Sequence, residues 1–180
     1  MLYTANINIE RNANPKGVDM PSEERASTED GLLENHDYID MRGIDNEYAI
    51  SVILEEAEIL NRIAAIPEDR QQEDLIEIMD ELWEACSPLI AFDIGVGGMV
   101  HALSAVGCVP ISSCNGGVLG DFHSLPHPWV ITHAPVSILD FLFEVADRAG
   151  VGLANNDNGM LEIYADDIMK FHRMAHLLVT

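Results

Sequence analysis

Trp129–Tyr164 reads WVITHAPVSILDFLFEVADRAGVGLANNDNGMLEIY, and this stretch decides the fold. It begins with aromatic and β-branched residues, which are typical of a strand. Pro135 and the Ser137-x-x-Asp140 spacing then predict the start of a helix that Gly150 ends. Two further apolar segments flank Asn155–Gly159, whose residues tolerate positive φ, so the stretch closes with a predicted antiparallel hairpin.

The segment before this stretch continues the alternation of strands and helices. Leu89–Phe92 and Cys108–Ser113 are short apolar runs that predict strands, and Val96–Val106 between them has helical spacing. A strand, a helix and a second strand in succession are typical of parallel pairing with a crossover. We therefore expect an α/β (or α+β) domain, a small mixed β-sheet with helices packed on it.

Three more helices are predicted, over Asp45–Ala65, Asp69–Cys86 and Asp166–Leu178. Asp45 can cap the first of them and Asp166 the last. The second of these helices is amphipathic. Its apolar side, which we expect to face the core, consists of Leu75, Met79, Leu82, Trp83 and Cys86.

Residues 1–44 differ in composition from the rest of the chain. Tyr3–Glu10 alternates apolar and polar residues, which predicts a short strand. From Arg11 to Gly43 the sequence is polar and lacks an apolar period, so we expect a poorly ordered acidic arm. Residues 45–180 are then expected to form a single α/β domain.

The charge balance restricts the partners that the chain can bind. It has 31 acidic and 9 basic residues and a formal net charge of −22, and no Lys or Arg occurs between Gln71 and Asp147. Nucleic-acid binding draws much of its affinity from cations on phosphates, so a direct grip on DNA or RNA is not expected. Two explanations remain for the acidity: a surface for a basic protein, or a generally solvated surface suited to high salt.

The helix predicted over Asp69–Cys86 carries the densest acidic row. Like charges on one helix face repel one another, so such a row costs some stability. The row is either an ordinary solvated face or a surface that docks on a basic partner through Glu73, Glu77, Asp80, Glu81 and Glu84.

The composition also predicts the compartment. No run of about 18 uninterrupted apolar residues occurs, and the N-terminus lacks the pattern of a secretory leader. The three cysteines are too few for a disulfide scaffold. We expect a cytoplasmic protein that does not enter membranes, and the oligomeric state stays open.

A second candidate site follows the strand predicted over Cys108–Ser113. Strand-end hydroxyls and backbone groups can bind a small ligand there, through Ser112, Ser113, Asn115, Gly116 and Gly117. Gly95–Gly98, at the start of a predicted helix, can add N–H groups for an anion, although the full nucleotide fingerprint is missing.

Two kinds of chemistry are open at this strand end. Cys114 can act as a nucleophile with His127 or His133 as its base, and Asp93 or Asp121 can orient that imidazole. Alternatively, Cys114, His123 and His127 can hold a zinc ion, since His123-x-x-x-His127 has a ligand spacing found in zinc sites. No other cofactor is indicated.

The order of segments from Cys108 to about Ala165 resembles the wybutosine-synthesising tRNA methyltransferase family. That family has a Ser-Ser-Cys-Ser-Gly-Arg motif, and here Ser112-Ser113-Cys114-Asn115-Gly116-Gly117 and then Trp129–Pro135 occupy similar places. The resemblance implies S-adenosylmethionine-dependent methylation of a tricyclic guanosine in tRNA, with Ser112, Ser113, Cys114 and Gly116 near the site. Gly117 stands where the family has a basic residue, so the resemblance bears mainly on topology.

Two functions therefore follow from the sequence. The first is an antitoxin-like, immunity-type or inhibitor-like protein that binds and regulates a basic macromolecule. The second is an enzyme or small-ligand binder, nucleotide-like or metal-dependent, with its site at Ser112–Gly117 and the histidines His123, His127 and His133.

Overall fold

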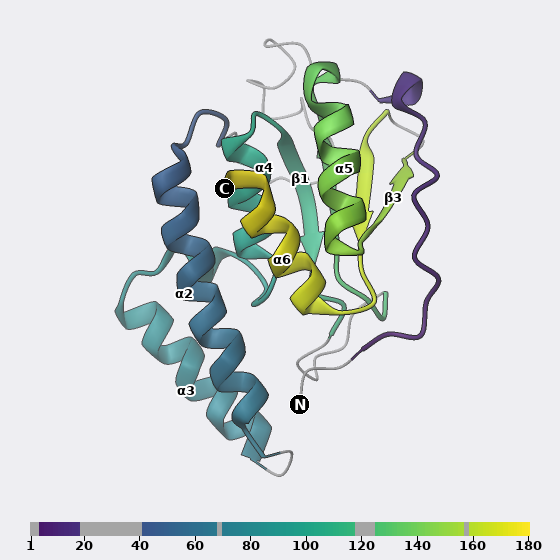
Figure 1. The fold of residues 1–180 in the computed structure, drawn as a ribbon. Coiled ribbons are helices and arrows are strands. Elements are labelled where there is room, and N and C mark those ends of the chain that lie inside the picture. The colour runs from purple at the N-terminus through teal and green to yellow at the C-terminus, as the bar shows by residue number, and fades with distance from the viewer. Residues whose placement is uncertain (1–3, 19–40, 68–69, 118–124, 157–158) are drawn as a thin grey trace.

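The computed structural model describes residues 4–18, 41–67, 70–117, 125–156 and 159–180 (Figure 1). The main helices are α2 (Asn46–Ala65), α3 (Gln71–Glu84), α4 (Gly97–Ala105), α5 (Leu139–Ala149) and α6 (Ile168–Val179). The strands are β1 (Val109–Cys114), β2 (Trp129–His133), β3 (Gly152–Asn155) and β4 (Leu161–Tyr164). Short 3-10 helices are η1 (Pro15–Gly17), η3 (Pro88–Ala91) and η4 (Val136–Ile138). The predicted combination of helices with a small sheet is confirmed.

The four strands form one sheet in the order β1-β2-β4-β3, and each neighbouring pair is antiparallel. The predicted hairpin is present as β3 and β4. The predicted parallel crossover is wrong, because Leu89–Phe92 does not form a strand. The Ser87 side chain accepts a hydrogen bond from the Leu89 N–H at 3.1 Å, and Pro88 occupies the first turn, so this segment forms η3 instead.

Helix α4 occupies the centre of the core. It packs against β1, α2 and α6, and all residues from Gly97 to Ser104 are buried. Its two polar side chains bond to their own backbone: His101 Nδ1 lies 2.8 Å from the Gly97 carbonyl, and Ser104 Oγ donates to the Val100 carbonyl at 2.8 Å. These hydrogen bonds satisfy the buried polar groups, as a helix without a solvent-facing side requires.

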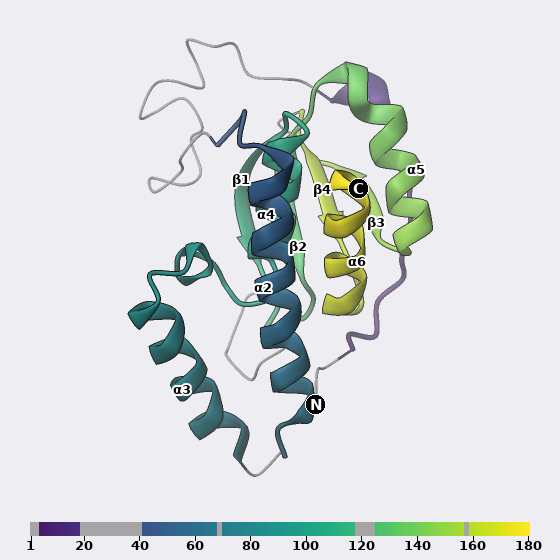
Figure 2. The same ribbon diagram turned by 60° about the vertical axis from the view of Figure 1, so that its left-hand side comes forward.

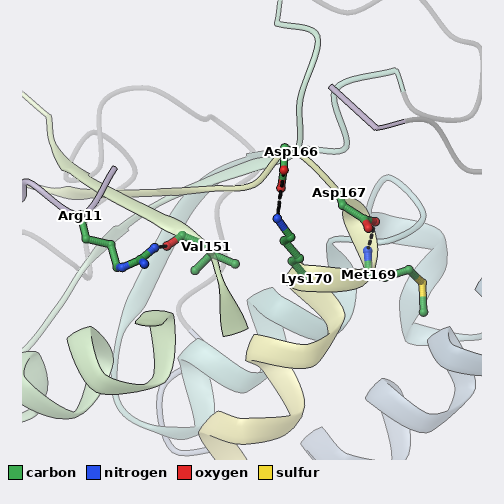
Figure 3. A network of polar contacts seen from close by, with 6 residues as sticks. All are labelled: Arg11, Val151, Asp166, Asp167, Met169 and Lys170. Carbon is green, nitrogen blue, oxygen red and sulfur yellow. Dashed lines mark hydrogen bonds and ion pairs between the residues drawn. The ribbon is translucent and has the colours of Figure 1, made fainter. Parts of the chain in front are cut away.

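The helix boundaries near the sheet differ in detail from the prediction. Ser137 and Asp140 do not form a capping box, because η4 precedes α5 and the residue before α5 is Ile138. Asp167, not Asp166, caps α6 by accepting from the Met169 N–H at 2.8 Å (Figure 3). Asp166 instead binds Lys170 Nζ at 2.6 Å. Gly150 ends α5 with φ +77°, as predicted.

Residues 10–14 of the N-terminal arm run along β3. Arg11 donates to the Val151 carbonyl at 3.0 Å (Figure 3). It also forms a parallel bridge with Leu153 and pairs with Asp147 at 2.9 Å. The Tyr164 hydroxyl donates to the Glu10 carbonyl and accepts from the Glu10 N–H. This segment therefore covers the edge of β3 that would otherwise be open.

The predicted N-terminal strand over Tyr3–Glu10 is wrong for its described part. Thr4 forms a single bridge with Asp167, and the Ala5 N–H donates to the Asp166 carbonyl at 2.7 Å. No ladder follows these contacts among residues 4–10. Residues 1–3 and 19–40, which include most of the predicted acidic arm, lie outside the described part of the chain.

Helix α3 stands apart from the body of the domain. It contacts α2 and η3, and the two views show it projecting beside the C-terminal half of α2, away from the sheet (Figures 1 and 2). The predicted apolar face is partly wrong: Leu82 is buried together with Ile78, but Met79 and Cys86 are exposed and Trp83 is 72% exposed. A helix with few neighbours can bury only a narrow stripe.

A Schellman motif ends α3 at a residue with a strained backbone. The Ser87 N–H donates to the Leu82 carbonyl at 3.0 Å and the Cys86 N–H to the Trp83 carbonyl at 3.1 Å. This motif places Cys86 at φ +51°, a conformation that favours glycine.

Cys86→Gly is therefore expected to raise the free energy of unfolding by about 0.5 to 1 kcal/mol, since it relieves this strain. Chemical denaturation would measure the change. Cys86→Ala is the matched control, because it removes the thiol and keeps the Cβ. An equal gain in both variants would show that the thiol, and not the backbone conformation, was unfavourable.

Candidate functional site

The predicted anion site at the start of α4 is already occupied by a side chain of the protein itself. Glu56, from the middle of α2, is fully buried there. Its Oε1 accepts from the Gly95 N–H at 3.0 Å and its Oε2 from the Gly98 N–H at 3.1 Å. A Cβ at Gly98 would lie only 2.6 Å from Glu56 Oε2, so glycine allows this close approach. The N-terminus of α4 thus binds α2 and is not available to an external anion.

Burial also changes the titration of Glu56. It raises the pKa of this carboxyl from 4.5 to about 7, although the backbone hydrogen bonds act in the opposite direction. Glu56 was not among the residues predicted from the sequence to form a site. Its position could have indicated burial, because Glu56 lies four residues after Val52 and four before Leu60, on the buried side of α2.

The strand end at Ser112–Gly117 is tightly folded. Asn115 donates its N–H to Asp93 Oδ2 at 3.2 Å and its side-chain amide to the Ile94 carbonyl at 3.2 Å. Asn115 Oδ1 accepts from the Gly117 N–H at 2.9 Å. Ser112 and Ser113 are half-buried on β1. Much of the backbone that was predicted to bind a ligand is therefore used in holding the turn.

Cys114 is buried in a setting that favours its neutral thiol. It accepts a hydrogen bond from the Gly116 N–H at 3.3 Å and donates one to Asp93. Burial raises the pKa of the thiol, and the neighbouring Asp93 carboxylate raises it as well, although the Gly116 bond opposes them. Because the thiolate is the reactive form, this arrangement does not favour a nucleophile.

The structure brings His127 to this strand end. Gly116 has φ +74°, and a Cβ placed there would lie 2.2 Å from the His127 carbonyl carbon. The His127 ring packs against Tyr164 with centroids 5.9 Å apart, and burial lowers its pKa. Its Nδ1 is buried and has no hydrogen-bond partner in the part of the chain that the structure describes.

His133 does not join the same cluster. It pairs with Val109 at one end of the β1–β2 ladder, whereas Cys114 pairs with Trp129 at the other. At about 3.3 Å per residue, the two ends of β2 are roughly 13 Å apart. The predicted pairing of His133 with Cys114 is therefore wrong.

Of the three residues predicted to bind zinc, the structure describes only Cys114 and His127. His123 and Asp121 lie outside the described residues, and among the described residues no three His, Cys, Asp or Glu side chains are grouped to hold a metal ion. The set of Cys114, His123 and His127 stays a prediction.

The contact between Gly116 and His127 can be tested by a single methyl group. Gly116→Ala is expected to lower the free energy of unfolding by about 2 kcal/mol, because both the positive φ and the clash with His127 are unfavourable. Gly43→Ala is the control, since Gly43 has φ +89° and nothing within 4 Å of an added Cβ. Equal losses in the two variants would show that Gly116 and His127 are not in close contact.

The acidic residues predicted to bind a partner lie on the outer surface of α3. They line a shallow depression together with Ile76, formed by Glu73, Ile76, Glu77, Asp80, Glu81 and Glu84. Glu81 binds Arg62 of α2 at 2.6 Å, and this contact lowers the pKa of Glu81. Asp74 pairs with Arg70 at 2.6 Å. Within the described residues, the remaining four acids have no ion-pair partner: Glu73, Glu77, Asp80 and Glu84.

A row of exposed apolar side chains lies beside these acids. Trp83 is 72% exposed, Ile76 58% and Met79 39%. Met79 and Trp83 were predicted to face the core, and Ile76 was not assigned to either side of the helix. The sequence of α3 contains two apolar rows, and this could have indicated an exposed one. Leu75, Ile78 and Leu82 supply the row that packs on the domain, so Ile76, Met79 and Trp83 form a second row.

Comparisons with protein-family models, curated proteins and solved structures found no match for this chain. The resemblance to the wybutosine-synthesising methyltransferases stays a prediction. No described helix combines the length and the apolar character needed to span a bilayer.

Proposed function

We propose that this chain is a cytoplasmic acidic binding protein that docks on a basic protein through α3 and regulates or inhibits it, as antitoxins, immunity proteins and other inhibitors do. The observation that carries the proposal is a row of four exposed acids that have no ion-pair partner among the described residues, on a helix that projects from the domain (Figure 2). Glu73 lies in the first turn of α3, where the helix dipole favours an acid, and Glu77 attracts Arg62 electrostatically. Asp80 and Glu84 have no such partner within the described residues.

The energetics of the row support this function. Glu73 and Glu77 are four residues apart, as are Asp80 and Glu84, and each such pair costs a few tenths of a kcal/mol in an isolated helix. A cationic partner would remove this repulsion and would also be attracted by a net charge of −22. Charge complementarity of this kind increases association rates and discriminates against neutral or acidic partners.

A capture experiment tests the proposal. The tagged protein is incubated with lysate of its native host, and bound proteins are identified by mass spectrometry. We expect a basic protein that is retained by the wild type and lost with the Glu73→Lys/Asp80→Lys/Glu84→Lys variant. The matched control reverses three exposed acids elsewhere, Glu47, Asp140 and Glu144. Retention by both variants would refute docking through α3.

The strand end supports a second candidate function, binding of a small ligand. Two buried polar atoms, Trp129 Nε1 and His127 Nδ1, have no hydrogen-bond partner among the described residues, and both residues neighbour Tyr164. Buried polar groups without partners are uncommon and call for an explanation, and a bound ligand supplies one.

The methyltransferase-related form of this second function can be tested directly. The chain has two tryptophans, Trp83 and Trp129, so tryptophan fluorescence of the Trp83→Phe variant comes from Trp129 alone. If S-adenosylmethionine binds at the strand end, its titration is expected to shift the Trp129 emission, and His127→Ala is expected to reduce the shift. A flat titration at millimolar cofactor would rule out this form of the function.

A further inference from the structure

We infer that the partner presents an amphipathic helix to α3, with an apolar row that packs on Ile76, Met79 and Trp83 and with lysines or arginines on the side that faces the acids. This inference rests on the proposed function and specifies the partner segment. It follows from the spacing of the exposed side chains, from the charges beside them and from the net charge of the chain.

The exposed apolar row has the spacing of a helix-packing seam. Ile76, Met79 and Trp83 are separated by three and then four residues. This is the spacing of positions a and d in a coiled coil, whose side chains insert between those of a facing helix. The row extends over about 10 Å at 1.5 Å per residue, which suits two turns of a partner helix.

The seam is separate from the side of α3 that packs on the domain. Ile78 and Leu82 are buried and Leu75 is half-buried, and these residues hold α3 against its neighbours. Met79 and Trp83 follow Ile78 and Leu82 by one residue each, so they lie about 100° further round the helix. A partner can therefore cover the exposed row without displacing α3 from the domain.

The acids lie on one flank of the seam. In the same seven-residue pattern, Glu73 and Asp80 fall at the e positions, where coiled coils select partners by charge. Glu77 and Glu84 fall at the b positions, which follow the e positions round the helix, further from the apolar row. A partner helix with cations on this flank would form ion pairs while its apolar row covers Trp83.

The charges also argue against a second copy of the chain as the occupant. Two copies would bring two acidic flanks together, each from a chain with a net charge of −22. Like charges in close opposition are unfavourable across an interface. Aromatic side chains in the centre of an interface contribute strongly to affinity, so the exposed Trp83 is expected to be the main anchor for a cationic helix.

Synthetic peptides test this inference. The probe is a dye-labelled amphipathic helix with leucines at a and d positions and lysines on the facing flank, and the comparison peptide carries glutamates in place of the lysines. Fluorescence anisotropy measures binding to the full chain. We expect the lysine peptide to bind at least tenfold more tightly than the glutamate peptide. Equal binding of the two peptides would overturn the inference.

The anchor is tested with matched protein variants. Trp83→Ala is expected to weaken the lysine peptide about 30-fold, as for a central aromatic anchor. Val136→Ala is the control, because Val136 is 70% exposed and lies on η4. Binding by Trp83→Ala within twofold of wild type would overturn the inference. Circular dichroism confirms that both variants stay folded.

The natural partner separates failure of this inference from failure of the proposed function. If the captured protein is lost on charge reversal of α3 but binds Trp83→Ala as tightly as wild type, docking through α3 stands and the helical seam is refuted. If charge reversal does not affect capture, the proposed function fails as well. A salt-independent dimer of the free chain in sedimentation, lost in Trp83→Ala, would instead identify a second copy as the occupant and overturn the inference.

Discussion

Glu56→Ala is expected to lower the free energy of unfolding by about 3 to 5 kcal/mol at pH 6. The variant would leave the buried N–H groups of Gly95 and Gly98 without an acceptor, and each unsatisfied group costs about 1 to 3 kcal/mol. It would also create a cavity between α2 and α4. Urea denaturation followed by circular dichroism measures the change. Glu58→Ala is the control on an exposed position of the same helix, with an expected loss within about 0.5 kcal/mol.

The same carboxyl predicts how stability depends on pH. Its pKa is about 7 in the folded protein and 4.5 without the fold, so the folded state binds the additional proton between these values. The ionised form is therefore unfavourable to folding above pH 7, and this penalty disappears as the pH falls toward 4.5. At 1.36 kcal/mol per pKa unit, the penalty amounts to roughly 3 kcal/mol.

Glu56→Gln isolates this contribution. The pH dependence of unfolding in the wild type, minus that of Glu56→Gln, is expected to show a gain in stability from pH 8 to pH 5. Burial lowers the pKa of His101 at the same end of α4, so His101 acts in the opposite direction, but it is present in both proteins and cancels in the difference. Parallel curves for the two proteins would show that Glu56 does not titrate in this range.

Neutralisation of α3 is expected to separate binding from folding. Glu73→Gln/Asp80→Asn/Glu84→Gln removes four of the close like-charge pairs along the helix, so its stability should match the wild type or exceed it by up to about 1 kcal/mol. Its affinity for the captured basic partner should fall on the order of 100-fold, equivalent to about 3 kcal/mol. Residues that serve only folding would not combine an unchanged or increased stability with a loss of affinity when they are neutralised.

The matched control for this variant is Glu47→Gln/Asp140→Asn/Glu144→Gln, which removes the same number of charges from other helices. We expect its affinity to stay within about threefold of wild type, because more distant charges are screened beyond a Debye length of about 8 Å. An equal loss in both variants would show that the total charge, and not the face of α3, determines binding.

The elements with strong local signals could be predicted from the sequence. The hairpin around Asn155–Gly159, the strand Trp129–His133 and the stop at Gly150 all depend on residue types that restrict their own backbone. The strand predicted at Leu89–Phe92 was wrong, because a short apolar run has no period that distinguishes a strand from a short helix, and Ser87-Pro88 favoured the helix. Without this strand the predicted parallel pair is missing, and all neighbouring strands are antiparallel.

The site was less predictable because tertiary contacts determine it. Proximity of His127 to Gly116 depends on how the segment before β2 returns to the end of β1, and no local pattern encodes it. The burial of Glu56 depends on the glycines of another helix. On α3, the choice of which apolar row faces the core follows from the position of α2, so Trp83 could be placed only by the structure.

Isothermal titration of the captured partner into wild type and Glu73→Gln/Asp80→Asn/Glu84→Gln, at 50 and 300 mM salt, tests docking through α3 most directly. We expect the wild type to bind about 100-fold more tightly than the variant at low salt, and we expect its affinity to fall more steeply than that of the variant as salt is added. Equal affinities and equal salt dependence in the two proteins would contradict docking through α3.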